Sequence, residues 1–199
     1  MCIRDRNFFD QQGREDLSIL PLRILPDPIL RRKARKVGAI DASIHKLAED
    51  MIETMRYHHC VGLAANQVGV LNLVISIEIP DEPVRVLINP AIIKRQGARE
   101  VEEGCLSIPG YKGLITRAIW VRAKSLDLGG REVRIKAEGL LAQALEHEID
   151  HLNGILYTDH LKKHEDIWKL ESPDEHLGKP ETSDHQDLRT GDPEEAPVI

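Results

Sequence analysis

The sequence EGLLAQALEHEIDHLN, residues 138–153, decides how the rest of the chain can fold. Its apolar residues recur every three or four positions, which is the spacing of one face of an α-helix. The apolar face consists of Leu141, Ala144, Leu145, Ile149 and Leu152. Because Gly154 follows as a residue suited to end a helix, we predict one buried helix that carries His147-Glu148-Ile149-Asp150-His151.

This five-residue run has the HExxH arrangement of metal hydrolases. Two histidines four residues apart project from one helical face, so their ring nitrogens can bind the same ion. Glu148 stands beside them, within reach of a metal-bound water. The alternative is a pair of ordinary, partly exposed histidines, but the glutamate between them favours a metal site. His160 and His164 have the same spacing with lysines between them, and we interpret that pair as surface residues.

A catalytic metal site usually has three protein ligands and one open position, so a third ligand is needed. In the longer pattern HExxHxxGxxH it would be a histidine, but Tyr157 stands at that place. A downstream Glu165 or Glu171 could serve, although that stretch is short, charged and close to an acidic tail. The other candidate is Cys105, in EEGCLSIPG at 102–110, which we expect to be a turn-rich segment between two sets of strands.

The rest of the chain predicts one N-terminal helix and several short strands. Asp41 is a suitable N-cap, and the apolar stripe that follows it ends near residues 57–59. This stripe consists of Ile44, Leu47, Ala48, Met51, Ile52 and Met55. Strands are expected over residues 71–79, 84–88, 92–94, 119–123, 126–128 and 133–135, with turns at residues 80–83, Asn89-Pro90 and Gly129-Gly130. Short turns join antiparallel neighbours, so the predicted fold class is α+β, with antiparallel sheets packed around a central C-terminal metal-binding helix.

The composition indicates a single domain with a differently charged end. The chain has 199 residues and a net charge of −6. Residues 171–199 hold nine acidic and two basic residues, a net of −7, so residues 1–170 carry +1. This near-neutral body argues against a large nucleic-acid-binding field. We expect a loose leader at 1–19, a catalytic domain at 20–170 and an acidic, disordered tail at 171–199.

Sequence features that would direct the chain to a membrane or out of the cell are not recognised. No apolar run approaches the roughly 20 residues of a membrane span, and the first residues lack the apolar core of a secretion signal. The three cysteines lie far apart without a CxxC pair, which is typical of a reducing compartment.

Three motifs, in order along the chain, resemble the signature motifs of the peptide deformylase family. They are GLAANQVG at 62–69, EGCLS at 103–107 and HEIDH at 147–151. The segment ILPDPILRRKA at 24–34 also looks like the family's usual start, and the resemblance covers residues 22–161. It implies an enzyme that removes the formyl group from the N-terminal formyl-methionine of newly synthesised polypeptides and releases formate.

The resemblance also implies roles for particular residues. The metal ligands would be Cys105, His147 and His151, and Glu148 would act as general base and then as general acid. The ion would be Fe²⁺, with Zn²⁺, Ni²⁺ and Co²⁺ tolerated; one thiolate and two imidazoles also suit zinc. The expected partners are formyl-methionyl nascent peptides at the ribosome exit, with no DNA and no membrane. The expected location is a bacterial-type cytoplasm, with an organelle left open and the oligomeric state undetermined.

Further residues take their roles from the same resemblance. Gln67 and the backbone N–H of Leu106 would hold the oxyanion, and Gly62 would line the substrate cleft. Two positions depart from the family's usual pattern: Cys60 replaces a glycine, and Glu146 replaces a glutamine and adds a negative charge near the ion. Asp150 is interpreted either as a hydrogen-bond partner that orients a ligand histidine or as a carboxylate on the helix surface.

Two other functions remain as alternatives at this point. A zinc peptidase would share the HExxH helix but would not need Cys105. A ribosome- or RNA-binding module without catalytic activity would use the basic run at 31–36, although such a run is usually a solvated face.

Overall fold

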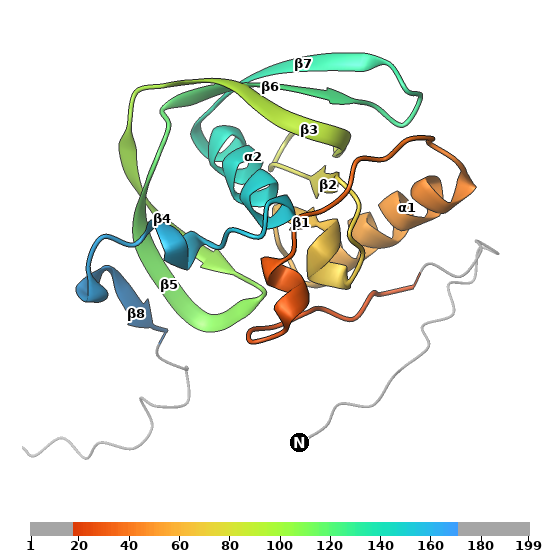
Figure 1. The fold of residues 1–199 in the computed structure, drawn as a ribbon. Helices are drawn as coiled ribbons and strands as arrows, with labels where there is room; N and C mark the ends of the chain where they lie inside the picture. Colours follow the sequence, from red (N-terminus) through yellow and green to blue (C-terminus); the bar gives the residue numbers. More distant parts are fainter. Residues whose placement is uncertain (1–17, 171–199) are drawn as a thin grey trace, which may run out of the picture.

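The computed structural model describes residues 18–170, which form two α-helices, eight strands and short 3-10 turns (Figure 1). The helices are α1 (Ala42–Tyr57) and α2 (Gly139–Leu152). The strands are β1 (Gly62–Ala64), β2 (Val74–Ile77), β3 (Arg85–Gln96), β4 (Arg99–Cys105), β5 (Ile108–Arg117), β6 (Trp120–Leu126), β7 (Glu132–Glu138) and β8 (Ile167–Lys169). The 3-10 turns are η1 (Pro28–Arg31), η2 (Ala65–Val68), η3 (Tyr157–His160) and η4 (His164–Asp166).

The predicted acidic tail and nearly all of the predicted leader lie outside the described residues. Within the part of the chain that is described, no helix is long and apolar enough to cross a membrane.

All strand pairs are antiparallel, and they form two sheets. The larger sheet has the order β1-β2-β3-β6-β7, and the smaller has the order β4-β5-β8. In Figure 1, β3, β6 and β7 arch over α2, while β4 and β5 pass along its other side. The α+β fold with antiparallel sheets around the C-terminal helix is therefore confirmed.

Helix α2 is central because its apolar face packs on the inner side of the larger sheet. Leu145 and Leu152 are fully buried and share a core cluster with Val121 and Ala123 of β6. Gly154 follows the helix with a φ of +76°, a conformation that costs a residue with a Cβ about 1–2 kcal/mol. The predicted end of the helix therefore agrees with the structure.

Helix α1 also begins and ends where its sequence pattern predicts. The carboxylate of Asp41 accepts hydrogen bonds from the backbone N–H groups of Ser43 and Ile44, at 3.0 and 3.3 Å. Met51 and Met55 are fully buried in a second core cluster. Both methionines therefore fill the core, as their spacing along the helix indicates.

The turn predicted at Asn89-Pro90 is wrong, because β3 runs through it from Arg85 to Gln96. The pairing of β3 with β6 shifts register between Ile88 and Ala91, so a bulge accommodates the proline. Asn89 takes a φ of +54°, and its side-chain amide exchanges two hydrogen bonds with the backbone of Val37. The turn residues thus bend the strand without ending it.

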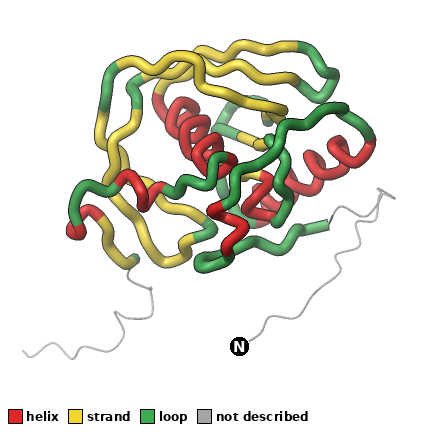
Figure 2. Tube along the Cα trace, viewed as in Figure 1, coloured by secondary structure: helices red, strands yellow, loops and turns green. Residues whose placement is uncertain are grey.

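The segment around Cys105 is also more regular than its sequence indicates. Residues 99–105 and 108–117 form the paired strands β4 and β5, with a tight turn between them. This hairpin, which the sequence pattern missed, supplies most of the second sheet (Figure 2). The predicted hairpin at Gly129-Gly130 is confirmed, because β6 pairs with β7 along its whole length.

We predict that Gly154→Ala destabilises the protein more than Gly130→Ala does. Both glycines have similar positive φ values, of +76° and +77°. A Cβ at Gly154 would lie 2.5 Å from the backbone oxygen of Arg31, whereas at Gly130 the nearest atom is 4.0 Å away. Gly130→Ala should therefore cost about 1–2 kcal/mol of unfolding free energy and Gly154→Ala distinctly more, as measured by urea denaturation. Equal losses would show that the contact with Arg31 is unimportant.

Candidate metal centre

The three predicted metal ligands lie together between β4 and α2. The Sγ atom of Cys105 is 3.2 Å from Nε2 of His151, which is 3.2 Å from Nε2 of His147. Their ligand atoms all lie within 4.8 Å of one another. Of the groups of histidine, cysteine and acidic residues in the described chain, this is the one that could hold a metal.

Two different elements bring these side chains to one point. Helix α2 places His147 and His151 one turn apart on the same face, as the sequence predicts. Cys105 ends β4, immediately before the hairpin turn, and its Sγ accepts a hydrogen bond from the N–H of Ser107 at 3.4 Å. A sulfur and two imidazole nitrogens are ligands that a transition-metal ion prefers.

A buried ion network orients His147. Its Nδ1 lies 2.7 Å from Oε2 of Glu103, so Nε2 is left to face Cys105. Glu103 also accepts two hydrogen bonds from the guanidinium of Arg117, at 2.8 and 3.0 Å. Arg117 donates a third, at 2.5 Å, to Asp150 of α2. A carboxylate on the far nitrogen of a ligand histidine fixes both its tautomer and its ring orientation.

The same network sets the pKa values of its members. Burial alone would raise the pKa of Glu103, but hydrogen bonds from His147 and Arg117 outweigh it and lower that pKa to about 2. Burial alone would lower the pKa of His147, but hydrogen bonds to Cys105 and Glu103 hold it well above its usual value. Burial and the neighbouring His147 keep the pKa of His151 well below its usual value.

Glu148 is a buried carboxylate without a compensating partner. It is 3% exposed, and its Oε2 atom has no hydrogen-bond partner. Burial raises its pKa to about 7, although the adjacent His147 opposes the shift. A buried polar oxygen is normally hydrogen-bonded, so the orphaned oxygen indicates that a further group belongs in this site.

Gly62 of β1 makes room for the Glu148 carboxylate. A Cβ built on Gly62 would collide with Oε1 of Glu148 and would lie 2.9 Å from its Cδ. Glycine at this position is therefore required by the packing of Glu148, whatever else Gly62 contacts.

Gln67 lies at the edge of the same site. Its Oε1 accepts a hydrogen bond from the N–H of Ala64 at 2.8 Å, which stabilises the η2 turn. Its Nε2 points the other way, 3.5 Å from Sγ of Cys105 and 3.3 Å from Oγ of Ser107. The side chain thus holds the turn and presents an amide donor to the site. Leu106 follows Cys105 directly in the β4–β5 turn.

Three of the other residues considered in the sequence analysis do not contribute a ligand to the site. Glu146 does not add a charge toward the ligands, because its carboxylate accepts hydrogen bonds from Arg95 at 2.7 Å and from the N–H of Ala118 at 2.9 Å. Cys60 is half-buried, and burial together with Glu148 raises its thiol pKa to about 12. Glu165 is exposed beside Lys163, and Glu171 lies outside the described residues.

Asp150 and His160 are closer to the site than a surface interpretation allows. Asp150 is 8% exposed and bonds to Arg117, so it acts on the ligand histidines only through that arginine. Nε2 of His160 lies 2.8 Å from Oδ2 of Asp150. His164 is exposed, as expected. The surface interpretation of His160 is therefore wrong in part, and long-range contacts of this kind leave no pattern in the sequence.

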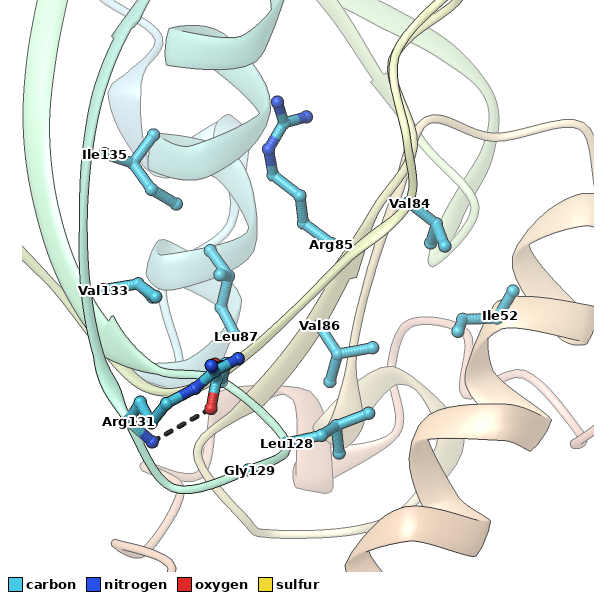
Figure 3. Close-up of a pocket in the computed structure, with 11 residues that line it drawn as sticks. Ile52, Val84, Arg85, Val86, Leu87, Leu128, Gly129, Arg131, Val133 and Ile135 are labelled. Carbon is cyan, nitrogen blue, oxygen red and sulfur yellow. Dashed lines mark hydrogen bonds and ion pairs between the residues drawn. The ribbon is translucent and has the colours of Figure 1, made fainter.

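A cavity lies away from these residues. It has a volume of about 520 Å³ and lies between α1, β3 and the β6–β7 turn (Figure 3). Its walls are mostly apolar side chains, among them Ile52, Val86 and Leu128. None of the predicted site residues lines it, so the cavity is separate from the metal centre.

Comparisons with known proteins agree with the motifs. The sequence model of the polypeptide deformylase family matches residues 19–166. A peptide deformylase of Dehalococcoides mccartyi is 55% identical over 152 residues, covering 76% of this chain and 91% of the relative. That of Alkaliphilus metalliredigens is 50% identical over 147 residues, covering 74% and 99%.

Solved structures are similar as well. The peptide deformylase of Legionella pneumophila has a TM-score of 0.71 at 43% identity, covering 73% of this chain and 87% of that one. A Synechococcus elongatus peptide deformylase, solved in complex with actinonin, has a TM-score of 0.72 at 38% identity, covering 74% and 83%.

The low pKa of Glu103 predicts a loss of stability in acid. Its pKa in the fold, about 2, is below the ordinary 4.5, so its contribution is present above pH 4.5 and is lost as the pH falls toward 2. The contribution is about 3 kcal/mol. His147 stays protonated over this range and adds no slope.

The measurement is urea unfolding of the metal-free protein between pH 4.5 and pH 3, where Glu148 is already protonated in the fold. Glu103→Gln should flatten the acid dependence. Glu102→Gln, an exposed neighbour on β4, should leave the dependence as in the parent protein. An unchanged slope in Glu103→Gln would contradict the assignment.

Proposed function

The chain belongs to the peptide deformylase family, whose members remove formyl groups from nascent peptides. We propose which role each of its site residues has in that reaction. Cys105, His147 and His151 are the proposed metal ligands. Glu148 is the proposed general base and acid, and Gln67 and the Leu106 N–H are the proposed oxyanion donors. The observation that carries this proposal is the convergence of the three ligand atoms beside a buried carboxylate with an orphaned oxygen.

These residues fit a divalent metal ion. The three ligand atoms come from one thiol and two imidazoles, and His147 is held by Glu103 with its Nε2 facing the other two. When bound, such an ion polarises the formyl carbonyl and lowers the pKa of a bound water toward 7. We propose Fe²⁺ as the native ion on the family resemblance, with Zn²⁺, Ni²⁺ or Co²⁺ able to replace it.

Glu148 is placed to move the proton that the reaction requires. Hydrolysis of the formamide takes one proton from the attacking water and gives one to the departing amine. A carboxylate with a pKa near 7 can accept and release a proton at neutral pH. The orphaned Oε2 is the atom proposed to hold it between the two steps.

Gln67 is proposed to stabilise the negative charge that develops on the formyl oxygen. Its Oε1 is fixed by the N–H of Ala64, so the direction of its Nε2 is set before substrate binds. The Leu106 N–H is proposed as the second donor, since it directly follows the ligand Cys105. Donors fixed in advance in this way are worth roughly 10²–10³ in rate. Gly62, on the other side of Glu148, is proposed to line the substrate cleft.

The wider setting follows from the substrate. We propose that the enzyme acts on formyl-methionyl nascent peptides near the ribosome exit, in a bacterial-type cytoplasm. The proposed catalytic unit is residues 20–170, because every residue given a role lies between Gly62 and His151. The two alternatives account for less of the site. A peptidase has no use for Cys105, and an RNA-binding module has no use for the buried Glu148.

Glu148→Ala should strongly reduce formate release while the metal stays bound. The substitution removes the proton carrier, so kcat/KM for a formyl-methionyl peptide should fall roughly 10²–10⁴-fold. Metal content, measured by mass spectrometry of digested protein, should not change. Glu165→Ala is the matched control, because Glu165 is exposed in η4. Loss of metal or activity in Glu165→Ala would instead favour that residue as a ligand.

Gly62→Ala should impair catalysis through Glu148 without unfolding the protein. Gly62 is not among the glycines with positive φ, so alanine suits its backbone, but the new methyl group displaces the Glu148 carboxylate. A displacement of about 1 Å can cost roughly 10²-fold in rate, so we expect kcat to fall at least about tenfold. Gly38→Ala, with no atom within 4 Å of its Cβ, is the control. Full activity in Gly62→Ala would show that Glu148 can act from another position.

A further inference from the structure

The outer side of the larger sheet has a concentration of positive charge. Strands β3, β6 and β7 turn one side toward α2 and the other away from it (Figure 1). Along β6 the buried residues alternate with exposed Arg122 and Lys124. Along β7, Arg134 and Lys136 are exposed in the same alternation. The sheet therefore separates an apolar inner side from a basic outer side.

The strand register places these cations next to one another. Lys94 of β3 is paired with Arg122 of β6, which is paired with Lys136 of β7. In the adjacent row, Lys124 of β6 is paired with Arg134 of β7. Like charges directly opposite each other destabilise a sheet. We call these five cations, together with Trp120, the basic sheet face.

Carboxylates balance only part of this charge. Glu132 lies 2.9 Å from Arg134, and Glu138 lies 3.3 Å from Lys136. Lys94, Arg122 and Lys124 take part in none of the ion pairs found among residues 18–170. Three neighbouring cations of the described chain therefore have no carboxylate partner.

An aromatic ring lies at one end of the rows. Trp120 is half-buried on the outer side of β6, and the Nζ atoms of Lys94 and Lys136 each lie 5.5 Å from its ring centroid. Trp120 is paired with Glu138 of β7 and Gln96 of β3. A ring flanked by cations on a sheet is the combination with which proteins stack a base and bind its phosphates.

We propose that the basic sheet face binds single-stranded RNA, with a base against Trp120 and phosphates on Lys94, Arg122 and Lys124. Charge complementarity supports a polyanion. The choice of RNA rests on the proposed action at the ribosome, where a nascent chain emerges beside RNA. Binding is measured without formate release, so failure of this proposal and failure of the proposed function are distinguishable.

The face is remote from the proposed chemistry. Inner residues of the same strands, such as Val121 and Ala137, pack in the core cluster with Leu145 of α2. The outer residues point away from that helix, so their charge can be changed while the site is left intact. Bound RNA would hold the enzyme near its substrate and leave the metal centre open.

The test uses the fluorescence of Trp120. The chain has two tryptophans, and Trp168→Phe in the full-length protein leaves Trp120 as the sole reporter. Titration with a single-stranded oligouridine RNA should quench this fluorescence. The logarithm of the binding constant should fall with the logarithm of salt concentration, with a slope of about −0.7 per phosphate contacted.

Two triple variants, each losing three positive charges, test whether RNA binding depends on this face or only on the total charge of the protein. Lys94→Gln/Arg122→Gln/Lys124→Gln should weaken binding at least about tenfold and reduce the salt slope by about 2. Arg32→Gln/Lys33→Gln/Lys36→Gln alters exposed residues of the N-terminal basic run and should change binding less than twofold. Both variants should retain formate release, and neither should melt at a lower temperature than the parent, since the sheet-face variant removes like-charge pairs.

Several results would overturn the proposal. One is the absence of quenching at low salt, and another is equal weakening by the two triple variants. Binding to vesicles of anionic lipid in preference to the RNA would assign the face to a membrane surface. Carbodiimide cross-links from Lys94 or Lys124 to carboxylates of 171–199 would assign it to that segment of the chain.

Discussion

The buried guanidinium of Arg117 is the group on which the rest of the site depends. It projects from β5 and bonds to Glu103 on the adjacent β4 and to Asp150 on α2. A single cation thereby ties the smaller sheet to the central helix. Because Glu103 also bonds to His147, the same contact sets the distance between strand and helix and the orientation of a proposed ligand.

Such a network fixes geometry as well as contributing to stability. Arg117 and Glu103 are each only 3% exposed as side chains, and removing charges from water costs several kcal/mol per ion unless the pairing is good. Here the pairing is two-pronged on Glu103 and is completed by Asp150, so the charges are compensated. What the arrangement adds is orientation. His147 must present one particular nitrogen, and a carboxylate fixed on both sides cannot rotate away from it.

The sequence predicts those helices and strands that have a regular local pattern of apolar residues. Both helices and the β6–β7 hairpin follow from spacing, and the ligand candidates on α2 follow from the helix. The β4–β5 hairpin does not, because glutamates and glycines interrupt its alternation, and its inward Glu103 and Arg117 are charged. Asn89-Pro90 has the composition of a turn, but contacts with the distant Val37 turn it into a bulge. In each case a contact between residues far apart in sequence overrides the local preference.

Side chains along β6 and β7 alternate between the inner and the outer side of the sheet, and the two sides have different requirements. Inner positions on β6 and β7 must be small or aliphatic, since α2 packs directly on them and carries the ligands with it. Folding requires nothing in particular of the outer positions, and stability alone would oppose paired rows of cations there. The small and aliphatic residues of the inner side are thus explained by their packing against α2, which carries the proposed ligands. The charge of the outer side calls for a cause outside the fold, and an external anion supplies one.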